Sequence, residues 1–248
     1  MSIKYHLLFC AGETVELRLQ QNEVKQIIMV KNKLTSHPEF LKALSFLDKL
    51  DANLASARKT YGNPPDRFEP ATFPSLVRII LGQQISRQVA KVLWQRLQKN
   101  GWQEADTLAS LNFDELQSVG LSRRKAEYVI ELARAETDGR LNLKQLNKQP
   151  AEKFSAKLIG FRGIGSWTIS NYRLFCLSDF DAWPGNDLAL MKVVKRLKML
   201  DRLPTHSEMD EFARQWQPYR GAAALLLWHL HSCLVGNGTP TERKLTRE

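Results

Sequence analysis

The sequence contains no hydrophobic stretch long enough to span a membrane, and it contains few cysteines. The longest apolar run is Ala222–Trp228, far short of the roughly 20 residues that a membrane-spanning helix needs. Cys10, Cys176 and Cys233 are odd in number and widely separated, which argues against a disulfide framework or a zinc site. The first ten residues lead into a polar segment, unlike a secretion signal. We therefore expect a protein of a reducing cytoplasm.

The chain also lacks any block of five like charges, any internal repeat of fixed period and any compositionally biased segment. It has 248 residues, of which 43% are hydrophobic and 25% charged, so a disordered chain is excluded and a sizeable core is expected. The net charge is +10, and the basic residues are spread along the sequence. This favours a folded groove for a polyanion such as nucleic acid, although many basic proteins bind none.

Hydrophobic periodicity divides the chain into a short β-like part and a long helical part. Strand-like alternation occurs in Ile3–Cys10, Thr14–Leu19 and Val24–Val30, which predicts a small antiparallel sheet. Beyond residue 36, apolar residues recur at spacings of three and four, and Gly and Pro separate the blocks. The predicted helical blocks are Phe40–Leu50, Phe73–Leu97, Leu108–Val119, Arg123–Ala135, Ala151–Leu158, Trp167–Leu177, Asp187–Leu197, Ser207–Trp216 and Ala222–Leu234. The sequence thus predicts a mainly α protein with a small β-leaning N-terminus.

The predicted organisation has five parts along the chain. Residues 1–36 form the β segment, and residues 37–70 form N-terminal helices and a linker that pack with the C-terminal helices. Residues 71–200 form a central helical domain, 201–235 the C-terminal helices and 236–248 a polar tail. The boundary near residue 70 follows from the clustered prolines of the 64–70 segment.

The segment Leu158–Ser170 combines two predicted helices with a glycine-rich turn, Gly163-Ile164-Gly165. Glycines on both sides of one apolar residue allow a tight turn while the isoleucine fills the gap between the helices. The second helix begins with unpaired N–H groups and the positive end of its dipole, which suit a phosphate oxygen. Taken alone, Gly163-Ile164-Gly165 could equally be a turn between two packed helices without a role in binding.

Four further segments accompany this hairpin, and together they carry a family resemblance. They are Ile80–Ser86, Leu121–Ala126, Asp181–Leu190 and Trp216–Arg220, the last leading to Trp228. In this combination the sequence resembles the helix-hairpin-helix superfamily of DNA glycosylases and, within it, the 3-methyladenine DNA glycosylase II group. The resemblance covers roughly residues 70–235 and implies a bundle of two helical subdomains with a cleft between them.

The resemblance implies that Asp187 is the catalytic residue. Asp187 lies 20 residues after Trp167 of the hairpin and directly follows a Pro-Gly-Asn turn. Cleavage of an N-glycosidic bond passes through a sugar with oxocarbenium character. A nearby carboxylate stabilises that charge and orients the attacking water. Asp187 also precedes a predicted helix, where an aspartate commonly serves as a cap, and the two roles are compatible.

The resemblance further implies a base pocket, a wedge and a DNA-backbone surface, since the target base must leave the duplex before its bond is reached. Electron-rich rings suit a cationic alkylated purine. The implied base-pocket residues are Trp167, Trp228, Phe161 and Tyr172, each of which also fits a core role. The implied wedge is Gln84 with Ile85, and the implied backbone contacts are Gly163, Gly165, Thr168, Arg162 and Lys125. Leu188 and Asn171 stand where related enzymes carry aromatic residues. The base pocket is therefore expected to be more open or to select different bases.

No cofactor is expected to be required. The resemblance implies a structural Na⁺ or K⁺ ion on the main-chain carbonyls of Ile159, Phe161 and Ile164. An iron–sulfur cluster is not expected, because it needs four closely spaced cysteines and Cys233 stands alone near the C-terminus. Trp167 occupies the place of the lysine nucleophile of strand-cleaving relatives, so we expect a monofunctional enzyme that leaves an abasic site.

The expected partner is double-stranded DNA with alkylated bases, bound by a monomer. The expected compartment is the cytoplasm with its chromosomal DNA, or the nucleus in a eukaryote. The alternative hypothesis is a helix-hairpin-helix module that binds DNA or senses damage without catalysis.

Overall fold

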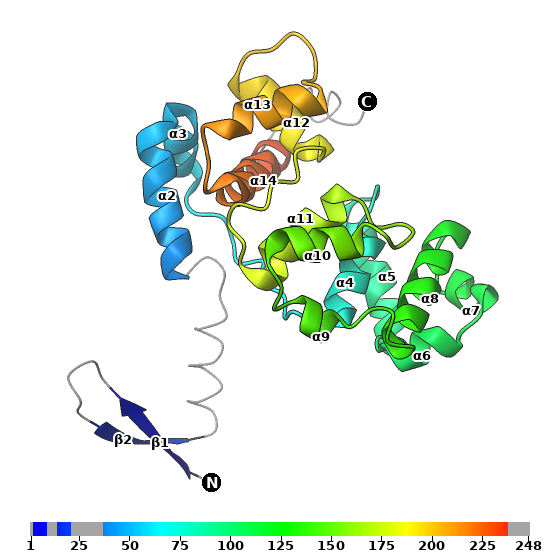
Figure 1. The fold of residues 1–248 in the computed structure, drawn as a ribbon. Helices are drawn as coiled ribbons and strands as arrows, with labels where there is room; N and C mark the ends of the chain where they lie inside the picture. The colour runs from blue at the N-terminus through cyan, green and yellow to red at the C-terminus, as the bar shows by residue number, and fades with distance from the viewer. Residues whose placement is uncertain (1, 9–13, 21–36, 238–248) are drawn as a thin grey trace.

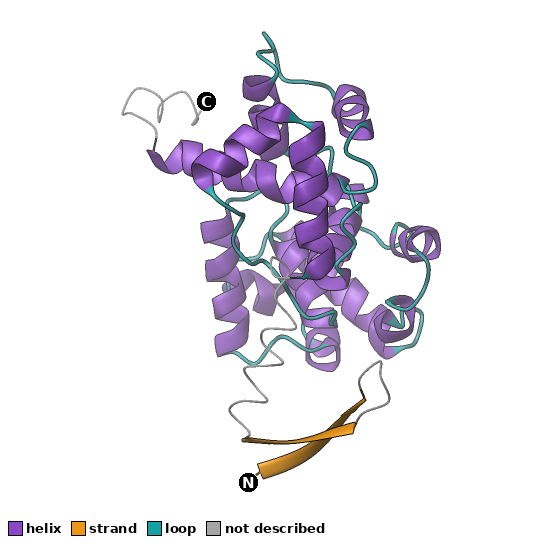
Figure 2. Cartoon of the chain, turned by 90° about the vertical axis from the view of Figure 1, so that its left-hand side faces the viewer, coloured by secondary structure: helices purple, strands orange, loops and turns teal. Residues whose placement is uncertain are grey.

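The computed structural model describes residues 2–8, 14–20 and 37–237. Over these residues the protein is mainly helical, with one two-stranded sheet (Figures 1 and 2), which confirms the predicted fold class. The helices are α2 (Pro38–Leu50), α3 (Ala52–Tyr61), α4 (Phe73–Leu81), α5 (Arg87–Lys99), α6 (Ala105–Ser110), α7 (Phe113–Ser118), α8 (Arg123–Thr137), α9 (Leu143–Leu146), α10 (Ala151–Leu158), α11 (Ser166–Leu177), α12 (Leu188–Leu197), α13 (His206–Arg214) and α14 (Arg220–Asn237). None of the helices in the described part of the chain is long and apolar enough to cross a membrane.

The strands β1 (Ser2–Leu8) and β2 (Thr14–Gln20) form an antiparallel pair. Ser2 lies opposite Gln20 and Leu8 lies opposite Thr14. The third predicted strand, Val24–Val30, lies outside the described residues, as do Cys10 and the tail beyond residue 237.

Two predicted helices are each divided in the structure. The predicted Phe73–Leu97 helix is α4 and α5, separated by the turn 82–86, because the Ser86 side chain caps α5 by accepting the Val89 N–H at 3.3 Å. The predicted Leu108–Val119 helix is α6 and α7, because Asn112 and Glu115 form a capping box that starts α7. Residues that satisfy the free N–H groups of a first turn set these boundaries, and apolar spacing alone does not show them.

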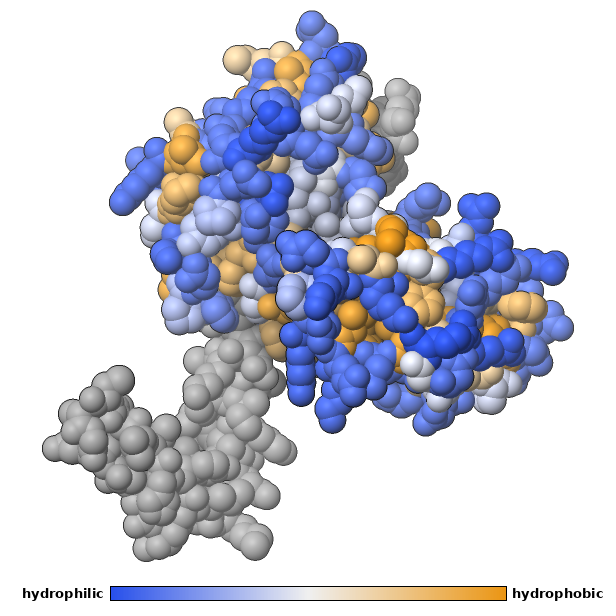
Figure 3. All heavy atoms as spheres, in the orientation of Figure 1, coloured by the Kyte–Doolittle hydropathy of each residue, from blue (hydrophilic) through white to orange (hydrophobic). Residues whose placement is uncertain are grey.

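The helices enclose two separate hydrophobic cores. The first lies among α4–α10, and α4 buries Leu76, Val77 and Ile80 in it completely. The second lies among α2, α3 and α12–α14, where every residue of 222–227 is buried. Because α14 is apolar on all its faces, it can be stable only when other helices surround it. Polar residues dominate the face seen in Figure 3, and apolar ones appear there only in small groups.

α11 joins the two cores, since it gives Ile169 and Tyr172 to the first and Leu174 to the second. α12 belongs to the second core, through Leu190, Val193 and Val194, so the central unit ends before the predicted residue 200. The linker 62–72 runs between the cores and is held to α11 by the Glu69 N–H, which donates to the Phe175 carbonyl at 3.1 Å. The loop that ends at Asp187 therefore lies where the two cores meet.

Candidate active site

Asp187 is the N-cap of α12, and its carboxylate accepts four hydrogen bonds. Oδ1 accepts the N–H groups of Ala189 at 2.9 Å and Leu190 at 3.1 Å, as a capping aspartate does. Oδ1 also accepts the indole N–H of Trp228 at 3.0 Å, and Oδ2 accepts that of Trp167 at 2.9 Å. The two indoles come from α14 and α11, so elements of both cores fix one carboxylate. Four donors stabilise its negative charge and hold its orientation.

Trp167 and Trp228 thus contribute their N–H edges to the site. Trp228 is 6% exposed, and its ring stacks on Phe175 with the centroids 5.6 Å apart. The guanidinium carbon of Arg67 lies 5.6 Å from the centroid of the same ring. The Trp228 ring is therefore packed between protein groups, and a base has less access to it than the predicted pocket role requires.

The other predicted pocket aromatics lie in different surroundings. Tyr172 is fully buried and stacks on Phe154 at 5.6 Å in the first core, so it is a core residue and does not line a base pocket. Burial raises the pKa of its hydroxyl. Phe161 is partly buried in the hairpin turn, with the Lys157 ammonium 5.9 Å from its ring centroid. Leu188, next to Asp187, is 55% exposed.

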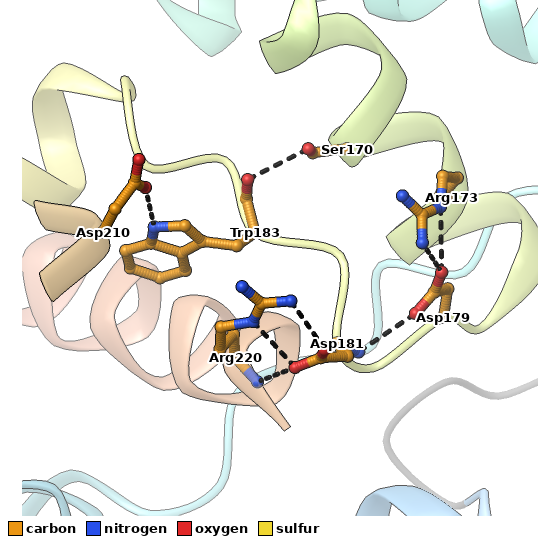
Figure 4. Close-up of polar contacts among 7 residues, drawn as sticks. All are labelled: Ser170, Arg173, Asp179, Asp181, Trp183, Asp210 and Arg220. Atoms are coloured by element: carbon orange, nitrogen blue, oxygen red, sulfur yellow. Dashed lines mark hydrogen bonds and ion pairs between the residues drawn. The ribbon is translucent and has the colours of Figure 1, made fainter. Parts of the chain in front are cut away.

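The loop before Asp187 is held by polar contacts on the side shown in Figure 4. Asp181 accepts the backbone N–H of Arg220 at 3.1 Å and forms an ion pair with its guanidinium at 2.7 Å. The Ser170 hydroxyl donates to the Trp183 carbonyl at 3.0 Å, and the Trp183 indole N–H donates to Asp210 at 3.1 Å. These contacts tie the loop to α11, α13 and α14. The pair of Asp181 and Arg220 brings the Asp181–Leu190 and Trp216–Arg220 segments together in space.

The hairpin connects α10 to α11 through Gly163, whose φ of 84° lies in the left-handed region. A β-carbon at this position would overlap the Tyr128 ring, so the turn needs glycine for its backbone angle and for space. Gly165 is the N-cap of α11 and has no side chain to satisfy the first N–H groups of the helix. These donors remain suited to an anion.

A second loop, residues 82–86, is fastened to the hairpin. The Gln83 side chain donates to the Gly163 carbonyl and to the Thr168 hydroxyl, both at 2.8 Å. The Lys125 ammonium donates to the carbonyls of Leu81 at 2.6 Å and Gln83 at 2.8 Å, and burial lowers its pKa. Lys125 therefore holds the loop, a role that differs from the predicted backbone contact.

Gln84 stands at the tip of this fastened loop. It is exposed and has a φ of 57°, an uncommon angle for a residue with a side chain. Such strain persists where the surroundings fix it, and functional sites often carry it. Ile85 follows and packs partly against the first core.

Arg162 projects from the hairpin and is exposed. Its guanidinium lies 3.6 Å from Glu127 and 6.0 Å from the Tyr128 ring centroid. Among the described residues, no cluster of three or more His, Cys, Asp or Glu side chains could hold a metal ion.

Sequence patterns missed a group of basic residues around Asp187, of which Arg67, Arg87 and Lys192 are cations. Arg67 comes from the linker, Arg87 from the start of α5, Lys192 from α12 and His231 from α14. The Asp187 charge acts on Arg67 and His231, and burial together with Lys192 and Arg87 lowers the pKa of His231. No local motif marks these residues, because they meet only when the two cores pack together.

Two helical cores, a glycine-containing hairpin and a carboxylate at their junction are the features of helix-hairpin-helix DNA repair proteins. The sequence model of the HhH-GPD superfamily, described as base excision DNA repair proteins, matches residues 77–218. This span is more than half of the chain, and the protein belongs to that superfamily.

Known proteins of the same fold resemble the chain over most of its length. It is 29% identical to the DNA-3-methyladenine glycosylase of Bacillus subtilis (strain 168), over 70% of this chain and 61% of the relative. A Schizosaccharomyces pombe 3-methyladenine DNA glycosylase, solved with abasic DNA, superposes with a TM-score of 0.70 and 25% identity, over 78% of this chain and 96% of that one. The 3-methyladenine DNA glycosylase of Archaeoglobus fulgidus shares the fold, with a TM-score of 0.70, 22% identity and coverage of 92% and 86%.

Proposed function

We propose that this protein is a monofunctional DNA glycosylase that releases alkylated purines of the 3-methyladenine and 7-methylguanine type. The observation that carries the proposal is the Asp187 carboxylate, held by four donors where the two cores meet. Two of these donors are the backbone groups of the helix cap, and a third is the indole of Trp167 at the start of α11, the second helix of the hairpin, so the carboxylate is fixed beside the proposed DNA-binding turn. The names of the relatives in B. subtilis and S. pombe agree with this activity.

In the proposed reaction the damaged nucleotide leaves the duplex and its sugar comes to rest beside Asp187. As the N-glycosidic bond breaks, its electron pair goes to the base and positive charge develops on the sugar. The fixed carboxylate stabilises that charge and orients a water molecule. The alkylated base, a cation in DNA, leaves as a neutral molecule. The water oxygen bonds to the sugar carbon, one of its protons passes to solvent, and an abasic site remains.

The hairpin and the 82–86 loop are the proposed DNA contacts. The N–H groups at the start of α11, with Gly163, Gly165 and Thr168 nearby, bind a phosphate, and Arg162 adds a flexible cation. Gln84, with Ile85 behind it, fills the space that the flipped base leaves. Trp167 and Phe161 are the proposed aromatic contacts of the base, while Trp228 acts through its hydrogen bond to Asp187.

A sodium or potassium ion at the hairpin is part of the proposal. The carbonyls of Ile159, Phe161 and Ile164 belong to one turn, and the Phe161 carbonyl also accepts the Ile164 N–H at 3.1 Å. Carbonyl oxygens have a second lone pair, so this bond leaves room for an ion. Such an ion would strengthen phosphate binding and has no part in breaking the glycosidic bond.

Incubation with methylated duplex DNA tests the proposed activity. We expect free 3-methyladenine or 7-methylguanine, abasic sites in equal number, and no protein–DNA adduct after borohydride treatment. Trp167 stands where a lysine nucleophile would be needed, and the Lys157 ammonium lies over the Phe161 ring. A trapped adduct would contradict the monofunctional mechanism. Binding to damaged DNA without release of any base would instead favour the non-catalytic module.

Replacement of Gln84 by glycine tests the wedge. Glycine accepts a φ of 57° without strain, so the variant removes the side chain alone. We expect base release from a fully paired duplex to fall roughly tenfold, since an unfilled gap costs stacking energy. The loss should shrink when the damaged base is mispaired and already easier to flip. Gln88→Ala, on the exposed start of α5, is the matched control, and an equal loss on both duplexes would contradict the wedge role.

A further inference from the structure

Arg67 carries a buried hydrogen-bond donor that the protein leaves unused. Its Nε is shielded from solvent and has no hydrogen-bond partner among the described residues. Its one described contact is with the Trp228 ring, 5.6 Å from guanidinium carbon to centroid. A desolvated donor of a charged group is costly unless an acceptor reaches it. The side chain is therefore poised for an acceptor that comes from outside the chain.

Other partly buried arginines in this protein each have a carboxylate partner, as expected for an arginine with a purely structural role. Arg220 pairs with Asp181 and Arg173 with Asp179, both through more than one nitrogen. Arg78 also lies over an indole, with its guanidinium carbon 5.5 Å from the Trp94 centroid, yet it forms an ion pair with Glu69. Arg67 has the aromatic contact without the carboxylate.

Arg67 keeps its charge at neutral pH and lies beside the catalytic carboxylate. Burial and the neighbouring Arg87 lower its pKa to about 10, while Asp187 acts in the opposite direction. The indole under the guanidinium is the one that donates to Asp187 at 3.0 Å. Arg67 and Asp187 thus contact the same indole, Arg67 over its ring and Asp187 at its N–H edge, which brings Arg67 to the side of the site where a base attached to a sugar at Asp187 would lie.

From this placement we infer that Arg67 contacts the flipped base and selects neutral purines that have a carbonyl oxygen at C6 and an unmethylated N7. An arginine fork matches the O6 and N7 acceptors of a 6-oxopurine such as hypoxanthine. A 6-aminopurine such as 3-methyladenine presents an amino group there, and a donor cannot pair with a donor. A backbone phosphate is the less suitable acceptor, because the Arg67 Nε is shielded from solvent whereas Arg87 is exposed.

This inference rests on the proposed glycosylase activity and extends it to a neutral base. A neutral base leaves with the electron pair of the broken bond and carries negative charge until a water proton reaches it. Hydrogen bonds from Arg67 to O6 and N7 stabilise that charge, while Arg67 keeps all its protons. A cationic base gains nothing from a neighbouring guanidinium. Arg67 therefore shifts the preference toward neutral 6-oxopurines and away from cationic bases, 7-methylguanine among them.

The test compares single-turnover release of hypoxanthine and of 3-methyladenine by the wild type, Arg67→Ala, Arg67→Lys and Arg78→Ala. We expect Arg67→Ala to lower hypoxanthine release roughly 10- to 100-fold, the range for a lost bidentate base contact, and to leave 3-methyladenine release equal or higher. Arg67→Lys keeps the charge and loses the fork, so it should recover only part of the hypoxanthine rate. Arg78→Ala removes a matched cation–indole contact and should leave the ratio of the two rates unchanged.

Two results would overturn the inference. If Arg67→Ala lowers both rates equally and weakens binding to undamaged DNA with a smaller salt dependence, Arg67 contacts a phosphate. If both rates fall equally together with the melting temperature, its role is structural. A wild type that releases neither base would instead refute the proposed function, and the inference with it.

Discussion

Replacement of Asp187 by asparagine is expected to reduce base release by at least 10²-fold while DNA affinity stays within a few-fold of the wild type. Removal of a catalytic carboxylate commonly costs 10²- to 10⁴-fold. Asparagine can still cap α12 through its oxygen, but its amide N–H₂ then faces the Trp167 indole N–H, which is also a donor. The variant loses the negative charge and the second indole contact, whereas the hairpin stays intact. Single-turnover release and equilibrium binding to damaged duplex measure the two effects separately.

Asp51 provides a close match as a control for this experiment. It caps α3 by accepting the N–H groups of Asn53 at 3.0 Å and Leu54 at 3.3 Å, and it accepts the Trp216 indole N–H at 3.0 Å. Asp51 also forms an ion pair with Lys198 at 3.6 Å. Asp51→Asn therefore alters a capping aspartate with an indole partner in the second core, outside the hairpin. It should lower thermal stability and leave base release unchanged at a temperature where the variant is folded. Loss of release in Asp51→Asn as large as in Asp187→Asn would mean that Asp187 acts as a cap alone.

The sequence located the parts of the site that depend on local geometry. The hairpin turn could be predicted because Gly163 and Gly165 are needed by the turn itself, whereas Asp187 follows from the family resemblance, since a place before a helix by itself indicates only a cap. The division of the predicted 73–97 helix was also readable, since Gly82 and Ser86 are helix-end residues. Apolar spacing continues across both residues and by itself predicts one helix.

The remaining parts depend on how the two cores meet, and no local pattern encodes them. Tyr172 follows Trp167 on the same helix, yet it faces the first core, because five residues turn the side chain to a different face. From the sequence, Lys125 is expected to be a surface cation. In the structure its ammonium donates to the Leu81 carbonyl at the end of α4, at 2.6 Å. Arg67 lies in a linker without a motif, and only the position of Trp228 gives it a role. Motifs thus point to Asp187 as the candidate carboxylate, while tertiary packing decides its neighbours.

Replacement of Gly163 by alanine is expected to weaken DNA binding and thermal stability together. Alanine at a φ of 84° costs about 1–2 kcal/mol in backbone strain. Its β-carbon would also overlap the Tyr128 ring, and such overpacking typically adds about 1–3 kcal/mol. Because the Gly163 carbonyl accepts the Gln83 side chain at 2.8 Å, a displaced turn also disturbs the loop that carries Gln84.

Gly139→Ala separates the two causes, since Gly139 has a φ of 80° and open space where the β-carbon would lie. It should show the strain alone, seen as a modest fall in melting temperature with unchanged DNA affinity. Adding Tyr128→Ala to Gly163→Ala should restore part of the affinity, measured against Tyr128→Ala by itself, because the smaller side chain removes the overlap. Equal DNA affinities of Gly163→Ala and Gly139→Ala would show that the hairpin turn does not position the phosphate-binding end of α11. Base release would then have to depend on another DNA contact, and Arg162 and the cations around Asp187 would be the groups to replace next.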